Sequence, residues 1–315
     1  MKGNKNMTKS KETLKAFVGE VINEMIHNND NWVKMFGDEN LLPATNAVTK
    51  NRYKGINYFM LAATTRDKGY KQNIRATYKQ WATVGAPVIS GPKSSTTIIF
   101  YKPPMYKDKK TGNIITGQVN YSDHERVTGP IMSAASVFNV AQVDLSNSSY
   151  KVEEKTNTQY SVANIDKFVK DTGVKIIFED DTSCYYQESK DLINMTPKEK
   201  FHDTKDADAT QHYYATLFHE LTHATKHKSR LDRKAQFEDD ARKSYAYEEL
   251  VAELGSVLLS QHFNQTKTVR ENHAQYLNSW IKALQKDFTF LTSAAQKASA
   301  AVEYYLNQQS KQRAA

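Results

Sequence analysis

Two histidines and a glutamate lie within the apolar segment YYATLFHELTHATKHKSRLDR, residues 213–233. On a helix, His219 and His223 project from one face and can present two imidazole nitrogens to a single ion. Glu220 follows the first histidine, where the H-E-x-x-H arrangement places the carboxylate that takes a proton from a metal-bound water. This pattern predicts a hydrolytic metal site of the peptidase type, with Zn²⁺ as the expected ion and another divalent ion such as Mn²⁺ as the alternative.

A catalytic zinc takes three protein ligands and keeps one position open. The segment EELVAE downstream offers three carboxylates, and Glu249 and Glu253 lie one turn apart on a face away from the apolar residues. We expect Glu249 to be the third ligand and Glu253 to orient a histidine. Glu248, whose next-turn neighbour is Ala252, is the alternative third ligand. Gly255 is unfavourable inside a helix and predicts a point where two helices approach closely.

The single cysteine, Cys184, excludes an internal disulfide framework and a thiolate-rich zinc site. We expect it to be a small, buried apolar residue in a strand. Any metal must therefore be held by histidine and carboxylate. The sequence contains no apolar run of about 18 residues and no signal-like segment behind its basic start. These features favour a soluble, cytoplasmic protein with no membrane partner.

The net charge of +8 is concentrated in the first half of the chain. Residues 1–145 carry 20 Lys and Arg against 11 Asp and Glu, whereas the remainder carries 23 against 24. The first half also interleaves aromatic and cationic residues, the combination that binds single-stranded nucleic acid by stacking and phosphate contact. A solvated basic surface with packed aromatics is the alternative. The residues predicted to contact DNA are Arg52, Tyr53, Lys54, Arg75, Tyr78, Lys79, Trp81 and Lys93.

Apolar residues recur at helical spacing over residues 9–27, which predicts an amphipathic helix. The segments 86–90 and 96–102 flank a Gly-Pro pair and predict a hairpin. Residues 103–129 are expected to form a mobile polar excursion, and 136–145 return to strand character.

In the second half we expect a helix over 160–171, strands over 174–180 and 183–189, and then helices to the end. The strand 183–189 is a candidate edge strand that could hold an extended substrate by main-chain pairing. Tyr185, Tyr186 and Tyr245 could donate a phenol hydrogen to a developing oxyanion, with packing as the alternative role.

The run 146–159 has almost no core-forming residues and is the predicted linker. The predicted fold class is therefore α+β with two domains: a basic α+β domain over 1–145, and a domain over 160–315 with a small sheet followed by helices.

The segments NAVTKNRYKGIN, YKQWATVGAPVISGPKSSTTIIFYK and VFNVAQVD resemble the N-terminal domain of ArdC-type antirestriction proteins. The segments YYATLFHELTHATKHKSRLDR and SYAYEELVAELGSVLL resemble the zincin-like metallopeptidase domain that follows it in that family. The resemblance covers about residues 10 to 310. It implies a plasmid or phage protein that binds single-stranded DNA and helps incoming DNA evade host restriction. It also implies that His219, His223 and Glu249 are ligands and that Glu220 is the base.

Two other functions fit the same residues. In one, the protein is a DNA-binding protective protein whose metal site is structural or vestigial. In the other, it is a peptidase whose basic half binds an acidic protein instead of DNA. The expected partners are single-stranded DNA and a protein substrate that the sequence does not identify.

Overall fold

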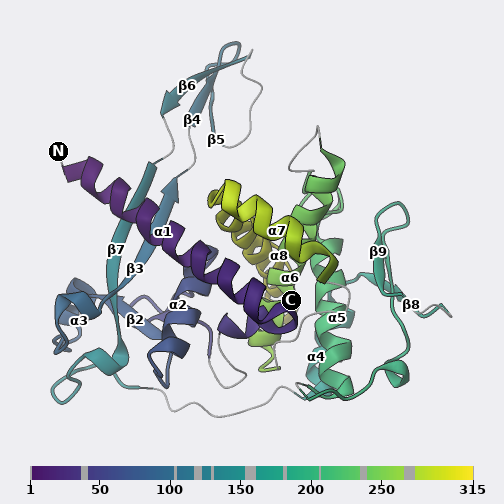
Figure 1. Ribbon diagram of the computed structural model, residues 1–315, viewed down its shortest axis with the longest axis horizontal. Coiled ribbons are helices and arrows are strands. Elements are labelled where there is room, and N and C mark those ends of the chain that lie inside the picture. Colours follow the sequence, from purple (N-terminus) through teal and green to yellow (C-terminus); the bar gives the residue numbers. More distant parts are fainter. Residues whose placement is uncertain are drawn as a thin grey trace.

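The protein consists of a sheet-containing N-terminal half and a mainly helical C-terminal half, and the two halves pack side by side (Figure 1). The computed structural model describes residues 2–36, 42–102, 105–116, 123–128, 131–152, 161–179, 183–205, 207–234, 240–265 and 274–314. No helix in these ranges is long and apolar enough to cross a membrane.

The N-terminal half is built on a four-stranded sheet of order β1-β2-β7-β3. Its strands are β1 (Thr45–Asn46), β2 (Ile74–Thr77), β3 (Thr96–Lys102) and β7 (Ile131–Asn139). Its helices are α1 (Lys2–His27), α2 (Ile56–Asp67) and α3 (Tyr78–Thr83), with 3₁₀ turns η1 (Asn29–Phe36), η2 (Pro92–Ser94) and η3 (Val140–Gln142). The amphipathic helix predicted over 9–27 is confirmed as part of α1.

The predicted hairpin between residues 86–90 and 96–102 is wrong. The second segment forms β3 as expected, but it pairs antiparallel with β7 along its whole length. The first segment makes only an isolated bridge, from Val88 to Val143. A 3₁₀ turn at η2 separates the two segments, and β7 offers β3 seven paired positions, more than the five-residue segment could.

The polar excursion predicted over 103–129 contains a small antiparallel sheet. Its strands are β4 (Met105–Asp108), β5 (Ile114–Thr116) and β6 (His124–Thr128), in the order β5-β4-β6. Asp108 accepts hydrogen bonds from the backbone N–H groups of Lys110 and Thr111, which closes the turn after β4. This sheet projects from the ends of β3 and β7 as an arm (Figure 1).

The C-terminal half contains a three-stranded sheet and five helices in its described part. The strands are β8 (Lys175–Ile177), β9 (Tyr185–Gln187) and β10 (Leu192–Asn194), in the order β8-β10-β9. The helices are α4 (Val162–Asp171), α5 (Ala209–Ala224), α6 (Ala241–His262), α7 (Ala274–Lys286) and α8 (Thr289–Ala314), with a 3₁₀ turn η4 (Lys198–Lys200). β9 is an edge strand of this sheet, as predicted.

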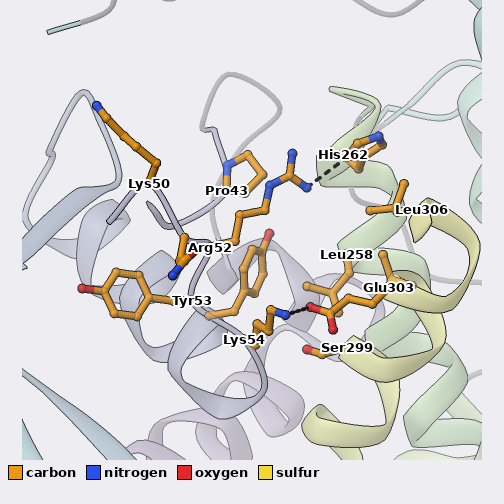
Figure 2. Close-up of a pocket in the computed structure, with 13 residues that line it drawn as sticks. Pro43, Lys50, Arg52, Tyr53, Lys54, Leu258, His262, Ser299, Glu303 and Leu306 are labelled. Carbon is orange, nitrogen blue, oxygen red and sulfur yellow. Dashed lines mark hydrogen bonds and ion pairs between the residues drawn. The ribbon is translucent and has the colours of Figure 1, made fainter. Parts of the chain in front are cut away.

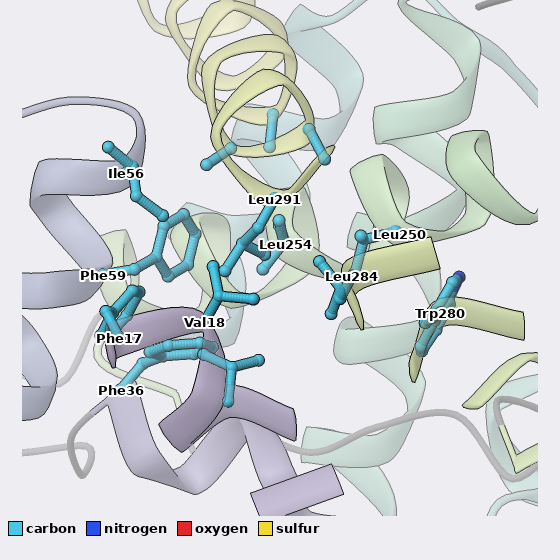
Figure 3. Close-up of a cluster of buried hydrophobic side chains, with 14 of the residues drawn as sticks. Phe17, Val18, Phe36, Ile56, Phe59, Leu250, Leu254, Trp280, Leu284 and Leu291 are labelled. Atoms are coloured by element: carbon cyan, nitrogen blue, oxygen red, sulfur yellow. The ribbon is translucent and has the colours of Figure 1, made fainter. Parts of the chain in front are cut away.

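The two halves share one hydrophobic core. Phe17 of α1, Phe36 of η1 and Phe59 of α2 belong to the same buried cluster as Leu250 and Leu254 of α6 (Figure 3). Trp32 meets Trp280 of α7 edge to face at 6.1 Å between ring centroids. Residues from both halves therefore position α6, the helix that carries Glu249.

The predicted linker begins against the N-terminal half. Tyr150 is buried and packs edge to face on Trp81, with ring centroids 5.4 Å apart. Residues 153–160 of the linker lie outside the described residues. The domain limits at 145 and 160 stay a prediction.

Because the core is shared, we expect Phe59→Ala to destabilise both halves together, by about 3–5 kcal/mol of unfolding free energy. Urea unfolding measures this, with tryptophan fluorescence and helical circular dichroism as two probes. Tyr78→Ala is the control, since Tyr78 is 60% exposed and its loss should change the unfolding free energy by less than about 0.5 kcal/mol. Separate transitions for the two probes would contradict a shared core.

Candidate metal centre

Helix α5 is fixed at both ends, and this sets the direction of His219, Glu220 and His223. At its start, Asp208 accepts a hydrogen bond from the backbone of Gln211, whose side chain accepts one from the backbone of Asp208 in return. At its end, Arg230 donates from Nε to the carbonyl oxygen of Ala224 at 2.6 Å.

The same arginine ties α5 to the small sheet. Arg230 forms an ion pair with Asp191, next to β10, and Asp191 also accepts a hydrogen bond from the hydroxyl of Tyr186 on β9. The Tyr186 hydroxyl therefore helps to position α5. One of the three tyrosines predicted as possible donors to an oxyanion thus has a structural role.

Helices α5 and α6 approach closely at Gly255. A Cβ atom added there would overlap the side chain of Thr222 on α5. The close approach predicted from this glycine is confirmed. It brings the histidines of α5 against the glutamates of α6.

His219, His223 and Glu249 form one compact cluster of potential ligands, each buried. The two Nε2 atoms lie 3.1 Å apart, and the Glu249 oxygens lie 3.4 Å from Nε2 of His219 and 3.3 Å from Nε2 of His223. Ligand atoms around a tetrahedral zinc with bonds of about 2.0–2.1 Å are about 3.3 Å apart. The donor atoms therefore already have the spacing of a tetrahedral metal site.

A second carboxylate backs each histidine. Glu253 lies 3.3 Å from Nδ1 of His219, within ion-pair distance although the two groups are not aligned as a hydrogen bond. Glu248 lies 3.2 Å from Nδ1 of His223. A carboxylate bonded to Nδ1, as Glu248 is to His223, directs Nε2 of that ring toward the other donors and increases its basicity.

Glu248 does have a partner, although the sequence suggested none. Arg233 donates from Nε to Oε2 of Glu248 at 3.1 Å and from Nη2 to Oε1. The same arginine donates to the carbonyl oxygen of Thr222 and to the hydroxyl of Thr225 at the end of α5. Of the two glutamates that the sequence left open, Glu249 joins the histidines and Glu248 supports one of them. The sequence did not predict this role of Arg233. The residue lies in the segment that carries the histidines, but its spacing from them matches no motif.

The buried charges perturb one another. Burial alone would lower the pKa of His223, but Glu248 and Glu249 outweigh it and raise that pKa to about 9. Burial opposes ionisation of Glu248, yet His223 and Arg233 lower its pKa to about 2. The pKa of Glu249 lies well below its usual range, because hydrogen bonds from both histidines outweigh its burial. Without metal, the centre is an ion-paired network.

Glu220 is 1% exposed and lies near the cluster. Its negative charge is one of the influences that raise the pKa of His223. Tyr245, one turn before Glu249 on α6, is 57% exposed. Burial of its hydroxyl, its hydrogen bond with Tyr276 and the nearby Glu249 charge all raise the pKa of Tyr245. Among the candidate phenols, Tyr245 is therefore placed beside the cluster and is protonated at neutral pH.

Most of the predicted DNA-binding residues are accessible, but two are not. Arg75 and Trp81 are both 0% exposed. Arg75 donates to the hydroxyls of Thr65 and Thr96, and Trp81 donates from Nε1 to the carbonyl oxygen of Phe138. The prediction that they contact DNA conflicts with this burial, since both side chains hold the N-terminal half together. Tyr53 is half-buried, and the exposed residues of the set are Arg52, Lys54, Tyr78, Lys79 and Lys93.

Two family models match the chain, one in each half. Residues 11–138 match the N-terminal domain of the anti-restriction factor ArdC. Residues 163–297 match the zincin-like metallopeptidase domain. The second match contains the three cluster residues, His219, His223 and Glu249, and the neighbouring Glu220.

The chain is also similar to curated proteins and solved structures. One DNA primase TraC of Escherichia coli is 33% identical over 85% of this chain, and a second is 31% identical over 98% of it. This chain spans only 24% of the length of the first and 21% of the length of the second. The uncharacterised protein y4eC of Sinorhizobium fredii is 30% identical over 84% of this chain and 81% of its own.

Two crystal structures of the antirestriction ArdC protein from plasmid R388 have the same fold. The metal-free form superposes with a TM-score of 0.70 at 29% identity, over 95% of this chain and 98% of that one. The Mn(II)-bound form superposes with a TM-score of 0.68 at 28% identity, over 94% and 97%. The relative's Mn(II) and the spacing of the three donors agree on a divalent-metal site here.

We expect Glu249→Gln to abolish tight Zn²⁺ binding, because it removes a ligand. Glu248→Gln should weaken binding by about 10–100-fold, because it removes only the support of His223. Competition with a chromogenic chelator measures both affinities. Glu199→Gln, at an exposed position on η4, is the matched control and should bind as the original protein does. Equal losses for Glu248 and Glu249 would show that both are ligands.

The metal affinity should rise with pH up to about 9. Below that pH, His223 is protonated in the metal-free protein, and the proton must leave before Nε2 can bind a metal. Each unit of decrease in pH should therefore cost about tenfold in affinity. Calorimetry in buffers of different ionisation enthalpy should detect about one released proton at pH 7. An affinity independent of pH between 6 and 8 would contradict the raised pKa.

Proposed function

The chain belongs to the family that joins an ArdC-type antirestriction N-terminal domain to a zincin-like metallopeptidase domain, and we therefore propose that it is an antirestriction-type protein of a plasmid or phage. In this proposal the basic half binds single-stranded DNA, and the helical half is a zinc-dependent peptidase that acts in the cytoplasm. The observation that carries the second part is the cluster of His219, His223 and Glu249 beside Glu220.

In the proposed reaction, His219, His223 and Glu249 hold the ion. A divalent metal held by these three residues would supply Lewis acidity for the peptide carbonyl and for water. Glu220 accepts the proton of the attacking water and returns it to the leaving amine nitrogen. Tyr245, protonated and close to Glu249, donates to the carbonyl oxygen as negative charge develops on it. The edge of β9 binds the extended substrate by main-chain hydrogen bonds.

Zn²⁺ is the proposed metal, because two imidazole nitrogens and one carboxylate at tetrahedral spacing are the ligands of many catalytic zinc sites. Mn²⁺, which the R388 relative binds in its crystal structure, is the alternative.

The DNA part of the proposal rests on the basic first half and on its accessible cations and tyrosines. Arg52, Lys54, Lys79 and Lys93 are exposed, and Tyr78 is 60% exposed beside Lys79. Exposed cations neutralise phosphates, and an exposed ring can stack on a base.

A DNA-binding protective protein with a structural metal site is the second candidate function. It is favoured by the burial of the centre, since His219 is 2% exposed, Glu220 1% and Glu249 6%.

The Glu220→Gln variant separates the two functions. It should keep the metal, because Glu220 is not in the ligand cluster, and it should lose peptidase and antirestriction activity. Glu199→Gln is the control for both assays. If Glu220→Gln keeps zinc and full antirestriction activity, catalysis is not needed and the protective protein replaces the peptidase. Trapping with Glu220→Gln in extracts that contain single-stranded DNA would identify the protein substrate.

DNA binding is tested separately by its dependence on salt. The logarithm of the affinity for single-stranded DNA should fall with the logarithm of salt concentration, with a slope of about −0.7 for each phosphate neutralised. Affinity for an acidic protein and none for DNA would instead assign the basic half to protein recognition.

A further inference from the structure

A pocket of about 600 Å³ lies where the two halves of the protein meet (Figure 2). One wall is the loop that leads from β1 to α2, in the basic half. The other wall comes from α6 and α8, through side chains that include Leu258, His262 and Leu306. The volume is within the range of about 300–1,000 Å³ that is usual for small-ligand sites. Leu258 is nine residues beyond Glu249 on α6, about 14 Å along the helix, so this pocket is separate from the metal centre.

The pocket carries an excess of positive charge. Lys50, Arg52 and Lys54 all line it, against one carboxylate, Glu303. Glu303 is paired with Lys54 at 2.5 Å. Among the described residues, Lys50 and Arg52 have no carboxylate partner, and Lys50 lies over the ring of Tyr150 at 4.7 Å. An anionic ligand would therefore be attracted to Arg52 and to the Lys50 side of the opening.

Arg52 reaches across the pocket and ends at a weak partner (Figure 2). Its Nη1 lies 3.2 Å from Nδ1 of His262 at the end of α6. A guanidinium only donates hydrogen bonds, so this nitrogen of His262 accepts and carries no proton. A phosphate oxygen would form a stronger, charge-assisted and bidentate hydrogen bond with the same guanidinium. Because Arg52 is exposed, the exchange requires little further desolvation.

The loop that presents these cations is held rigidly. The backbone N–H of Asn46 donates to the carbonyl oxygen of Asn51, and that of Tyr53 donates to Ala44, both at 2.8 Å. Gly55 donates from its backbone to the hydroxyl of Ser299 on α8, also at 2.8 Å. A site that is ordered before the ligand arrives loses less entropy on binding.

The wall opposite Arg52 has an apolar part beside its polar residues His262, Ser299 and Glu303. Leu258 of α6 and Val302 and Leu306 of α8 line it. A matching ligand therefore combines a phosphate with a flat, less polar group, and a nucleotide has both. We propose that this pocket binds one nucleotide of a single-stranded DNA, with a phosphate on Arg52 and the base against the α6–α8 wall. The proposal rests on the DNA-binding function proposed above and extends it, because it makes the peptidase half part of the DNA site.

The test measures the binding of a short labelled oligothymidylate by fluorescence anisotropy at several salt concentrations, with full-length variants. Arg52→Ala should weaken binding about tenfold and reduce the salt slope by about 0.7, the value for one lost phosphate contact. Arg66→Ala is the matched control, because Arg66 is exposed on α2 and does not line the pocket. It should bind DNA as the original protein does.

Two variants on the peptidase side give the sharper result, since the N-terminal family match ends at residue 138. Leu258→Trp fills the space for the base and should weaken binding about tenfold without changing the salt slope. Glu303→Gln removes the one carboxylate among the described residues that line the pocket and should tighten binding several-fold. Glu303 and Lys54 are both partly exposed, so this variant keeps the fold even if Leu258→Trp does not.

The outcomes distinguish this proposal from the one on which it rests. In one outcome, the original protein binds the oligonucleotide with a steep salt dependence while Arg52→Ala and Glu303→Gln bind it with the same affinity. That result would overturn the pocket proposal and leave the DNA-binding proposal standing. If the original protein does not bind DNA, both fail. Thymidine monophosphate is added as competitor: tighter binding of the free nucleotide than of the oligonucleotide would overturn the assignment to DNA.

Discussion

The close contact of α5 with α6 at Gly255 is the constraint on which the metal centre depends. The hydrogen at this position admits the side chain of Thr222, and any larger group would separate the helices. The two histidine Nε2 atoms are 3.1 Å apart and each faces one Glu249 oxygen at 3.3–3.4 Å, so even a shift of about 1 Å between the helices would disrupt the grouping of ligands. Arg233 reinforces the same contact, because it bridges the end of α5 and Glu248 of α6.

Most residues of the metal centre could be predicted from the sequence, because they recur at helical spacing. His219 and His223 on one helix, and Glu249 and Glu253 on another, are spaced by one turn, so each pair shares a face whatever the tertiary structure. The contacts of Glu248 could not be predicted in this way, because its partners come from elsewhere: His223 lies on the other helix and Arg233 follows it in a loop. A search along one helix cannot find such partners.

In the N-terminal half, less of the structure could be predicted from the sequence. Its opening helix follows from apolar spacing, but its strand pairing does not, because β3 pairs with residues 29 to 41 positions away in sequence and not with the nearer segment at 86–90. Aromatic and cationic residues in that half also look alike in sequence whether they are buried or exposed. Arg75 is an example: a guanidinium in a basic, aromatic segment that is nevertheless fully enclosed by hydroxyl and carbonyl groups. Burial of this kind depends on long-range packing that local composition does not encode.

The shared core has a consequence for how this architecture can be inherited. Phe17, Phe36 and Phe59 cover α6 in the same cluster that holds Leu250 and Leu254, so a recombination event between the halves would leave a large apolar surface on each fragment. Such fragments would aggregate or be degraded. We therefore expect the two segments to be inherited together as one block.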